Sequence, residues 1–397
     1  MKKKRIVSSL LVATLLGIII SGCSDKVYVN RAITWADSGE DLDTALKSVE
    51  KATELEETKD WPKTYYAKGY VYQKIYENEK TDIAEDPLFK AFDNYEKAYN
   101  MEGGESLKGS IDATLFQLRK YFINDGVKAF QESDYRSALN NFSYALKVTE
   151  MPVFKGQVDT AVIFNAGIAA QNLKEWDKAA DYYKQAAEYG YDGARSYILL
   201  NNAYLQAGDT TKAVKALKEG FEKYPGNKQM IGRLINYFLL EAKEPQKAIE
   251  YLDAAEKEDP DNAEYYRAEA TAYDNMGENE KAIKNYKKAL ELDPDMFMAL
   301  YNMGVLYYNQ AVDIEGEANT TKDEAKYKEL KEKARAKLKE ALPYLEKALE
   351  VQPENASLVS TLSTVYYRLR VEDEKYMEKY EKMQEKLQQL NDAKNKK

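Results

Sequence analysis

An alanine followed four residues later by a larger apolar residue, and seven residues later by a small one, recurs along most of the chain. In one stretch these residues are Ala282, Tyr286 and Ala289. This spacing predicts a helix with all three on one face, where small residues admit a neighbouring helix and the large one fills the gap. The central steps between such alanines are 34, 35 and 34 residues, and so constant a period indicates a repeat. The eight alanines are Ala45, Ala91, Ala138, Ala179, Ala213, Ala248, Ala282 and Ala341.

A second helix is predicted before each of these. In one unit Tyr266, Ala270 and Tyr273 lie at helical spacing, and a turn at residues 277–279 separates them from the next helix. Proline lacks the N–H that would continue a helix, and it follows the second helix in several units. These residues are Pro225, Pro260, Pro294 and Pro353. The pattern therefore predicts helix–turn–helix units joined by proline-containing turns.

The stretch Ala263–Met296 resembles the tetratricopeptide repeat. The residues in that family's signature places are Tyr266, Ala270, Tyr273, Ala282, Tyr286, Ala289 and Pro294. Glu269 departs from the usual Leu, which is tolerable at an edge. The resemblance covers nearly all of residues 26–370, as about eight units and a degenerate ninth, and is strongest over 160–296. It implies an all-α fold, a right-handed superhelical solenoid of helix–turn–helix repeats with a concave inner face.

The irregular steps divide the chain into segments. We expect a signal peptide over 1–22, a lipidated end and short tether over 23–30, and divergent repeats with insertions over 31–158. Regular repeats follow over 159–296, then a repeat with a long insertion over 297–355, and a degenerate repeat with a capping helix over 356–397. The insertion at about 312–336 predicts a second helix extended backward from the array and kinked at Pro343. The polar stretch 78–87 predicts a loop.

The C-terminal segment carries a narrow apolar stripe at steps of four and three residues. Its members are Tyr376, Tyr380, Met383, Leu387 and Leu390. A stripe of this kind favours a helix that caps the last repeat, as solenoids require. The alternative is a helix that pairs with another chain.

The family resemblance also points to candidate binding residues. In tetratricopeptide proteins the first helix of each pair lines the concave face and commonly binds an extended peptide or a partner helix. Arg233 and Arg267, one repeat apart, could hold a peptide carboxylate, or could pair with acids such as Glu264 or Asp274. The candidates at the inner positions are Asn165, Gln171, Asn202, Arg233, Tyr237, Arg267, Thr271, Asp274, Tyr301 and Tyr308.

The N-terminus is typical of a secretory signal. Four basic residues precede an uncharged apolar run over 6–20 and two small residues. Ile20-Ser21-Gly22-Cys23 resembles the bacterial lipobox, although Leu is commoner where Ile20 stands. The resemblance implies cleavage before Cys23 and lipidation of its sulfur, with acyl chains such as palmitate. The alternative is a transmembrane anchor, but the run is shorter than the about 20 residues that spanning requires.

Composition narrows the chemistry. Without residues 1–22 the chain would carry 54 basic and 67 acidic residues, a net charge of −13, which disfavours nucleic acid as a partner. The sequence has no histidine, and Cys23 is its single cysteine. Catalytic triads based on His or Cys and the usual zinc sites are therefore excluded. The acidic turn 259–264 resembles a calcium site, but its counterparts in the next repeats indicate inter-repeat turns. We predict no catalytic residue, metal or cofactor.

Two functions remain open. The first is a membrane-anchored scaffold that binds proteins or peptides in the bacterial cell envelope, held by the lipid on Cys23 and facing the periplasm or the exterior. Ser24 favours the outer membrane if the Gram-negative sorting rule applies. The alternative is a lipoprotein that binds a glycan or peptide for uptake or secretion, which would need clustered aromatic residues. A carboxylate hydrolase would need two acids together in a cleft, and no pattern indicates such a pair.

Overall fold

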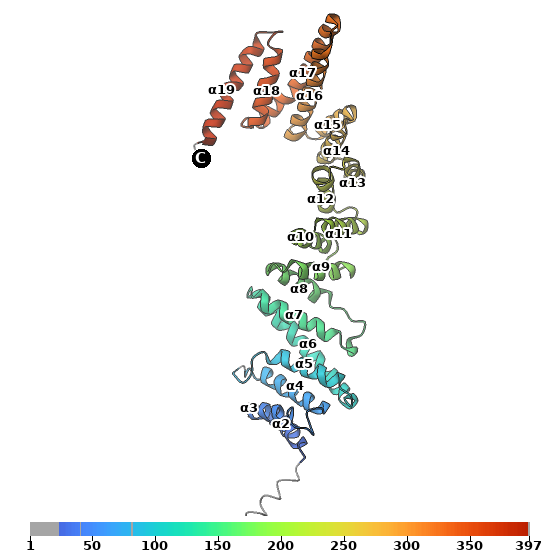
Figure 1. Cartoon of the computed structure of the whole chain (residues 1–397), viewed down its shortest axis with the longest axis vertical. Coiled ribbons are helices and arrows are strands. Elements are labelled where there is room, and N and C mark those ends of the chain that lie inside the picture. Colours follow the sequence, from blue (N-terminus) through green and yellow to red (C-terminus); the bar gives the residue numbers. More distant parts are fainter. Residues whose placement is uncertain (1–23, 40, 81, 396–397) are drawn as a thin grey trace, which may run out of the picture. The chain divides into compact units, whose positions relative to one another are not determined.

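The computed structural model describes residues 24–39, 41–80 and 82–395, and the predicted signal peptide and Cys23 lie outside them. This part of the chain contains 18 α-helices. They are labelled in Figure 1. Taken in chain order they form nine successive pairs, which agrees with the predicted eight units and a ninth. The helices are α2 (Lys26–Ser38), α3 (Leu42–Ala52), α4 (Pro62–Glu77), α5 (Pro87–Asn100), α6 (Lys108–Gln131), α7 (Tyr135–Thr149), α8 (Thr160–Asn172), α9 (Trp176–Glu188), α10 (Ala194–Gln206), α11 (Thr210–Lys223), α12 (Lys228–Asn236), α13 (Pro245–Glu258), α14 (Ala263–Asn275), α15 (Asn279–Leu292), α16 (Phe297–Thr320), α17 (Glu324–Val351), α18 (Ala356–Leu369) and α19 (Lys375–Asn395).

The residues of the recurring apolar pattern form the contact between the two helices of a pair. All eight pattern alanines are completely buried, as are Tyr95, Tyr183 and Tyr286 four residues further on. Opposite Tyr183 stands Gly167, where an added Cβ would come within 2.9 Å of the tyrosine ring. A small residue on the first helix thus allows the large one on the second to pack without strain.

The inter-repeat turns follow the predicted chemistry. Helices α11, α13, α15 and α17 each end two residues before the predicted proline. Asn262 and Asn355 then cap α14 and α18, since their side-chain oxygens accept hydrogen bonds from the first-turn amides of Glu264 and Leu358. These polar residues therefore serve as helix caps, as expected for turns.

The chain divides into two compact units, one ending at Asp209 and the other starting at Thr210. The first unit is built on an aromatic core that includes Phe92, Phe122, Phe142 and Phe154, all buried. The core of the second unit runs through α14–α18 and includes Met303, Leu338 and Leu362. The core of the second unit is continuous from α14 to α18, which is how a solenoid gains stability from neighbouring repeats.

The long insertion lengthens both helices of its pair, α16 at its C-terminal end and α17 at its N-terminal end. α16 runs on to Thr320, α17 starts at Glu324, and Asp323 caps α17 by accepting from the amides of Ala325 and Lys326. The sequence predicted only the backward extension of the second helix, so the forward extension of α16 is a correction. Ala318 and Leu330 are buried where the two extensions pack together, and that shared burial explains why both are helical. α17 continues through Pro343.

The ends of the array also agree with the apolar pattern. Residues 78–80 and 82–86, the described part of the segment between α4 and α5, contain no helix. Tyr376, Tyr380 and Met383 on α19 pack against the core of the second unit, and Lys379 pairs with Glu346 at 2.6 Å. α19 therefore covers the last repeat in the manner of a cap. At the other end, α2 starts at Lys26, inside the stretch predicted as a tether.

One step of the repeat is 35 residues instead of 34, and the fold absorbs the extra residue in a π-helical turn. This turn, η3 (Tyr237–Glu241), follows α12 directly. A π-turn accommodates one additional residue without breaking the helix. It leaves Leu240 exposed while Phe238 and Leu239 remain buried.

Candidate binding surface

Some first helices of consecutive pairs lie against one another in each unit. α2 contacts α4 in the first unit, and α14 contacts α16, which contacts α18, in the second. Residues at the fifth, ninth and twelfth positions of these helices share one face, because their spacing follows the helical turn. We call this the inner face. The predicted candidates lie on it or beside it, and all are partly exposed.

In the second unit, α14 places Arg267, Thr271 and Asp274 on the inner face. The Nε of Arg267 lies 2.6 Å from Oε2 of Glu264, so this arginine forms the ion pair with Glu264 that the sequence offered as an alternative. Thr271 donates to the carbonyl of Arg267, and its oxygen lies 3.2 Å from the buried Tyr286 hydroxyl. Burial raises the pKa of Asp274 above its ordinary value. The three side chains thus form a polar strip with one carboxyl group.

The remaining candidates of the second unit are spread over three elements. Burial lowers the pKa of Arg233 on α12, and Tyr237 lies in η3 with its ring 5.1 Å from that of Phe238. Tyr301 stacks on Phe297 at 5.8 Å on α16. Tyr308, seven residues further along α16, lies beneath the Arg368 guanidinium at 5.3 Å from the ring centre. These contacts hold the aromatic rings in fixed orientations while leaving part of each exposed.

In the first unit, the predicted candidates lie on α8 and α10. Gln171 accepts a hydrogen bond of 2.9 Å from the Tyr183 hydroxyl, so part of its side chain serves the packing of its own pair. Asn165 on α8 and Asn202 on α10 are partly exposed. The inner-face positions here carry amides, as at Gln171 and Asn202, beside apolar residues such as Ile168 and Leu205.

A tyrosine-rich part of the inner face was missed by the sequence reasoning. It lies on α4 and α6, and we call it the tyrosine network. Tyr66 and Tyr70 occupy the fifth and ninth positions of α4, the same places that Arg267 and Thr271 occupy on α14. The network also contains Tyr76 on α4 and Tyr121 on α6, whose rings lie 5.0 Å apart. The density of tyrosine over residues 65–76 was the available signal, but no candidate was predicted in the divergent repeats before residue 159.

Three hydroxyls of the tyrosine network donate to acidic side chains. Tyr70 donates to Asp37, Tyr76 donates to Asp125 at 2.9 Å, and Tyr121 donates to Glu77 at 3.1 Å. Burial, followed by the hydrogen bond to the carboxylate, raises the pKa of Tyr70 and of Tyr76 well above the ordinary value. The hydroxyls therefore stay protonated and fixed, so that the half-exposed rings form a rigid surface for contact.

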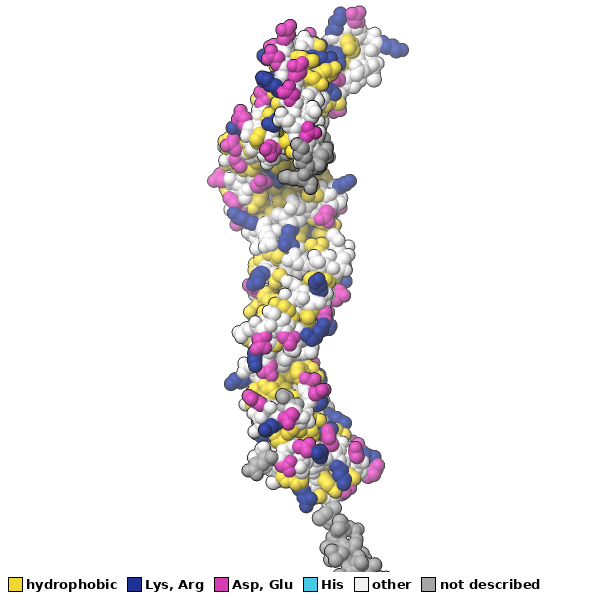
Figure 2. Space-filling model, turned by 90° about the vertical axis from the view of Figure 1, so that its left-hand side faces the viewer, with side chains coloured by type: hydrophobic (Ala, Val, Ile, Leu, Met, Phe, Trp, Pro, Cys, Tyr) yellow, Lys and Arg dark blue, Asp and Glu magenta, His cyan; other side chains and the backbone are white. Residues whose placement is uncertain are grey.

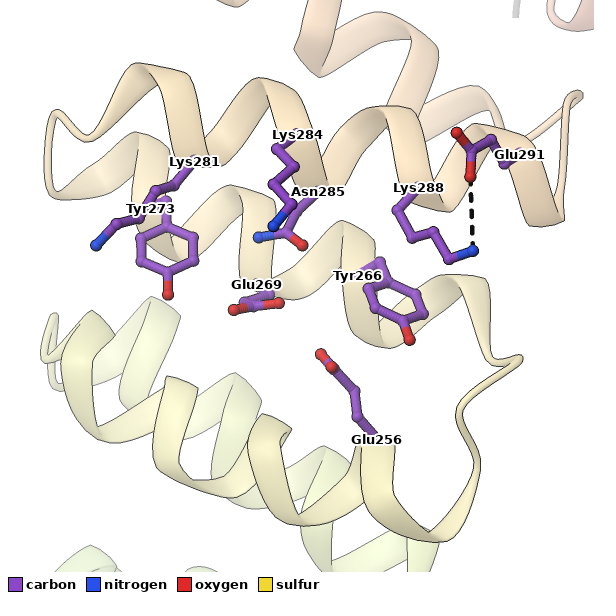
Figure 3. A pocket seen from close by; sticks show the side chains of 9 residues that line it. All are labelled: Glu256, Tyr266, Glu269, Tyr273, Lys281, Lys284, Asn285, Lys288 and Glu291. Atoms are coloured by element: carbon purple, nitrogen blue, oxygen red, sulfur yellow. Dashed lines mark ion pairs between the residues drawn. The ribbon is translucent and has the colours of Figure 1, made fainter.

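A pocket of about 680 Å³ lies on the side of α14 opposite the inner face. Figure 3 shows Glu256 pointing from α13 towards Glu269 on α14, with Tyr266 and Tyr273 on either side. Burial, followed by the charge of Glu269, raises the pKa of Glu256 to about 7. Burial also raises the pKa of Glu269, although Tyr273 donates a hydrogen bond to it. Two acids do meet in a pocket, which the sequence pattern did not indicate.

The two carboxyl groups face each other across the pocket from neighbouring helices (Figure 3). Two facing carboxyl groups disfavour the state in which both are ionised, because like charges repel. The arrangement therefore favours a proton held by the pair.

Metal sites and membrane-spanning helices are the other features to consider in the described part of the chain. Residues 24–39, 41–80 and 82–395 contain no group of three or more acidic side chains placed to hold a metal ion. None of the helices in those ranges combines the length and apolar character needed to cross a membrane. Basic and acidic side chains are interspersed over the face shown in Figure 2, rather than gathered by sign.

Three sequence profiles match the centre of the chain. One described as a TPR repeat matches residues 271–310, and two described as tetratricopeptide repeats match 204–272 and 164–228. Together they cover residues 164–310 without a gap, which includes the regular repeats read from the apolar pattern. The recognition of the repeat family is thereby confirmed.

Comparison with curated proteins finds partial relatives. The chain is 28% identical over 186 residues to the BBSome complex member BBS4 of Bos taurus, covering 46% of this chain and 35% of the relative. It is 32% identical over 89 residues to an uncharacterized protein, y4yS, of Sinorhizobium fredii, covering 22% and 48%. The chain thus spans less than half of the length of each of these relatives.

Solved structures of repeat proteins are also similar. A TPR repeats protein from Bacteroides fragilis is 27% identical, with 62% of this chain and 97% of that chain covered and a TM-score of 0.33. The C-terminal part of a TPR repeat-containing protein from Cytophaga hutchinsonii is 16% identical, with 68% and 95% covered and a TM-score of 0.46.

Proposed function

Because the chain carries tetratricopeptide repeats across residues 164–310, we propose that it is a scaffold whose inner face binds an extended segment of another protein. The observation that carries the proposal is the tyrosine network. Half-exposed rings held by hydrogen bonds offer large contact area at little entropic cost, a property of binding surfaces. Three of the network hydroxyls are already paired with acids, so recognition rests on the ring faces.

The second part of the proposal concerns location. The lipobox-like residues 20–23 support a lipid on Cys23, which would hold the scaffold at a membrane of the cell envelope, with the outer membrane favoured by Ser24. Confinement to a membrane raises the effective concentration of the inner face near membrane-bound partners. Metabolic labelling with palmitate tests the anchor directly. Label in the wild-type chain and none in Cys23→Ala is expected, and equal labelling of both would refute it.

The partner experiment is a crosslinked pull-down of the full chain from detergent-solubilised envelope, read by mass spectrometry. The test variant is Tyr66→Ala with Tyr70→Ala, which removes two rings from the inner face. The matched control is Tyr189→Ala, because this tyrosine is 57% exposed and lies outside the inner face. Partners lost from the test variant but retained by the control support the proposal. Equal recovery from both variants would contradict it.

The tyrosine network also favours a second candidate, binding of a glycan. Sugars stack on clustered aromatic rings, and the cluster that this alternative required is present on α4 and α6 as tyrosines. Titration of the full chain with envelope glycan fragments, followed by tyrosine fluorescence, separates the two candidates. A saturable change that Tyr66→Ala abolishes would favour glycan over peptide.

A further inference from the structure

The two glutamates of the pocket occupy places that are apolar in four other repeats each. Glu269 is the seventh residue of its helix, and the seventh residues of α10, α12, α16 and α18 are buried and apolar. Those residues are Leu200, Leu234, Met303 and Leu362. Glu256 stands eight residues after its pattern alanine, and the same place in four other units of the regular and C-terminal repeats is also apolar. Those residues are Ala187, Phe221, Leu290 and Leu349.

The two glutamates lie where α13 packs against α14, a contact between successive repeats that we call the α13–α14 joint. In the repeat register, the residue eight after the alanine faces the seventh residue of the following first helix, as Glu256 faces Glu269 in Figure 3. Elsewhere in the second unit the corresponding places hold Leu290 and Met303, and Leu349 and Leu362, all members of one core or packed on it. At the α13–α14 joint, a pair of glutamates thus takes the place of a pair of apolar residues. The apolar pair has no charge, whereas the glutamate pair avoids charge repulsion only when it holds a proton.

Hydrogen bonding indicates that the pair holds a proton. Oε1 of Glu256 is shielded from solvent, and among the described residues no N–H or hydroxyl donates to it. A buried acceptor without a donor is unfavourable, so a proton shared with the Glu269 carboxyl satisfies both groups. With that proton the pair is a hydrogen bond, and without it two carboxylates are in contact.

The surrounding charges only partly offset that repulsion. Asp253 on α13 adds negative charge, whereas Lys284 on α15 favours the ionised form of Glu269. The other groups that face the pair are already engaged. Lys281 pairs with Glu278, Lys288 lies 3.5 Å from Glu291, and Tyr273 donates to Glu269 itself.

We propose that the α13–α14 joint is a proton-dependent contact that is closed when Glu256 and Glu269 share a proton and loosens when both ionise. The joint connects α12 and α13 to α14 and α15, so it sets the spacing between inner-face residues of successive repeats, such as Arg233 and Arg267. The proposal is independent of what binds to the inner face.

The direction of the pH effect follows from the raised pKa of Glu256, about 7 in the folded protein against 4.5 ordinarily. Between these values the closed joint binds more protons than the open one, so closure weakens as pH rises towards 7 and stays weak above it. For one proton with these two pKa values, the opening equilibrium constant would rise by up to about twentyfold between pH 5.5 and 7.5. Solvent screening reduces that figure, so we expect a rise of about five- to twentyfold.

Hydrogen exchange of the full chain, read by mass spectrometry at pH 5.5 and 7.5 and corrected for intrinsic rates, measures this opening. The α15–α16 joint, with Leu290 and Met303, is an internal reference in the same molecule. Faster opening of α13 and α14 at pH 7.5, with no change at the reference joint, is expected. Equal changes at both joints would overturn the proposal.

Two variants make the test independent of folding defects. Glu256→Gln with Glu269→Gln keeps the size and hydrogen bonding of the pair but removes its titration, so the pH difference between the joints should vanish. Glu256→Leu with Glu269→Leu restores the apolar contact of the other repeats, so this chain is expected to fold and to open equally at both pH values. A pH difference that persists in either variant would refute the role of the pair.

Discussion

The close contact within each helix pair makes a quantitative prediction at two glycines of one helix. Gly304 and Gly316 both lie in α16. A Cβ added at Gly304 would lie 2.5 Å from Cγ and Cδ2 of Leu345, whereas at Gly316 nothing lies within 4 Å. The substitution Gly→Ala is the same at both places, so only the surroundings differ.

Two opposing contributions to the free energy of unfolding decide whether each substitution stabilises the protein. Alanine is favoured over glycine in a helix interior by about 1 kcal/mol at either position. Overpacking a well-packed core costs about 1–3 kcal/mol, and it applies only at Gly304 because Leu345 is completely buried. Gly316→Ala should therefore stabilise the hairpin of α16 and α17 by about 1 kcal/mol. Gly304→Ala should destabilise it by up to about 2 kcal/mol.

Native-state hydrogen exchange of the α16 and α17 amides is the suitable assay, because a repeat array does not unfold in one step. Leu345→Ala should cost about 2–5 kcal/mol alone, and adding Gly304→Ala to it should then stabilise, since the added methyl fills space that Leu345 vacated. If Gly304→Ala stabilises the wild-type chain as much as Gly316→Ala does, the contact between the helices is not as close as described, and the reasoning fails.

Three further predictions concern single side chains. Asp323→Ala removes the cap of α17 and should reduce the stability of the α16–α17 hairpin by about 1 kcal/mol, measured by exchange of the first-turn amides. Tyr95→Phe leaves Gln73, which is buried, without the 2.8 Å hydrogen bond from the tyrosine hydroxyl and should cost about 1–3 kcal/mol in the first unit, measured by urea unfolding. Glu269→Leu should stabilise the second unit more at pH 8 than at pH 5, because it removes a group that the fold keeps protonated above its ordinary pKa; equal thermal shifts at both pH values would contradict this.

Sequence reasoning predicted the helix pairs because their determinants are local. The alanine pattern, the asparagine caps and the prolines each act within one helix or one turn, and all appear where expected. It did not predict the forward extension of α16, since residues 312–320 become helical by packing on the extended α17. Nor did it select the tyrosine network, because the family signature is weak where α4 and α6 lie.

Glu269 shows most clearly what the local sequence pattern could not predict. Its departure from the usual Leu was visible, and an edge position was the expected explanation. The structure places it instead against Glu256, a residue of the preceding repeat, in a half-buried pocket. A single departure from a repeat pattern is ambiguous, whereas two that meet at one joint define a contact.

The sequence by itself determined that this protein is a series of helix pairs, because periodicity and turn chemistry are properties of short segments. The tertiary structure decided which side chains of different repeats meet, and therefore which acids share a proton and which tyrosines form one surface. That division has a physical reason: helix formation depends on neighbours along the chain, whereas burial, charge coupling and recognition depend on neighbours in space.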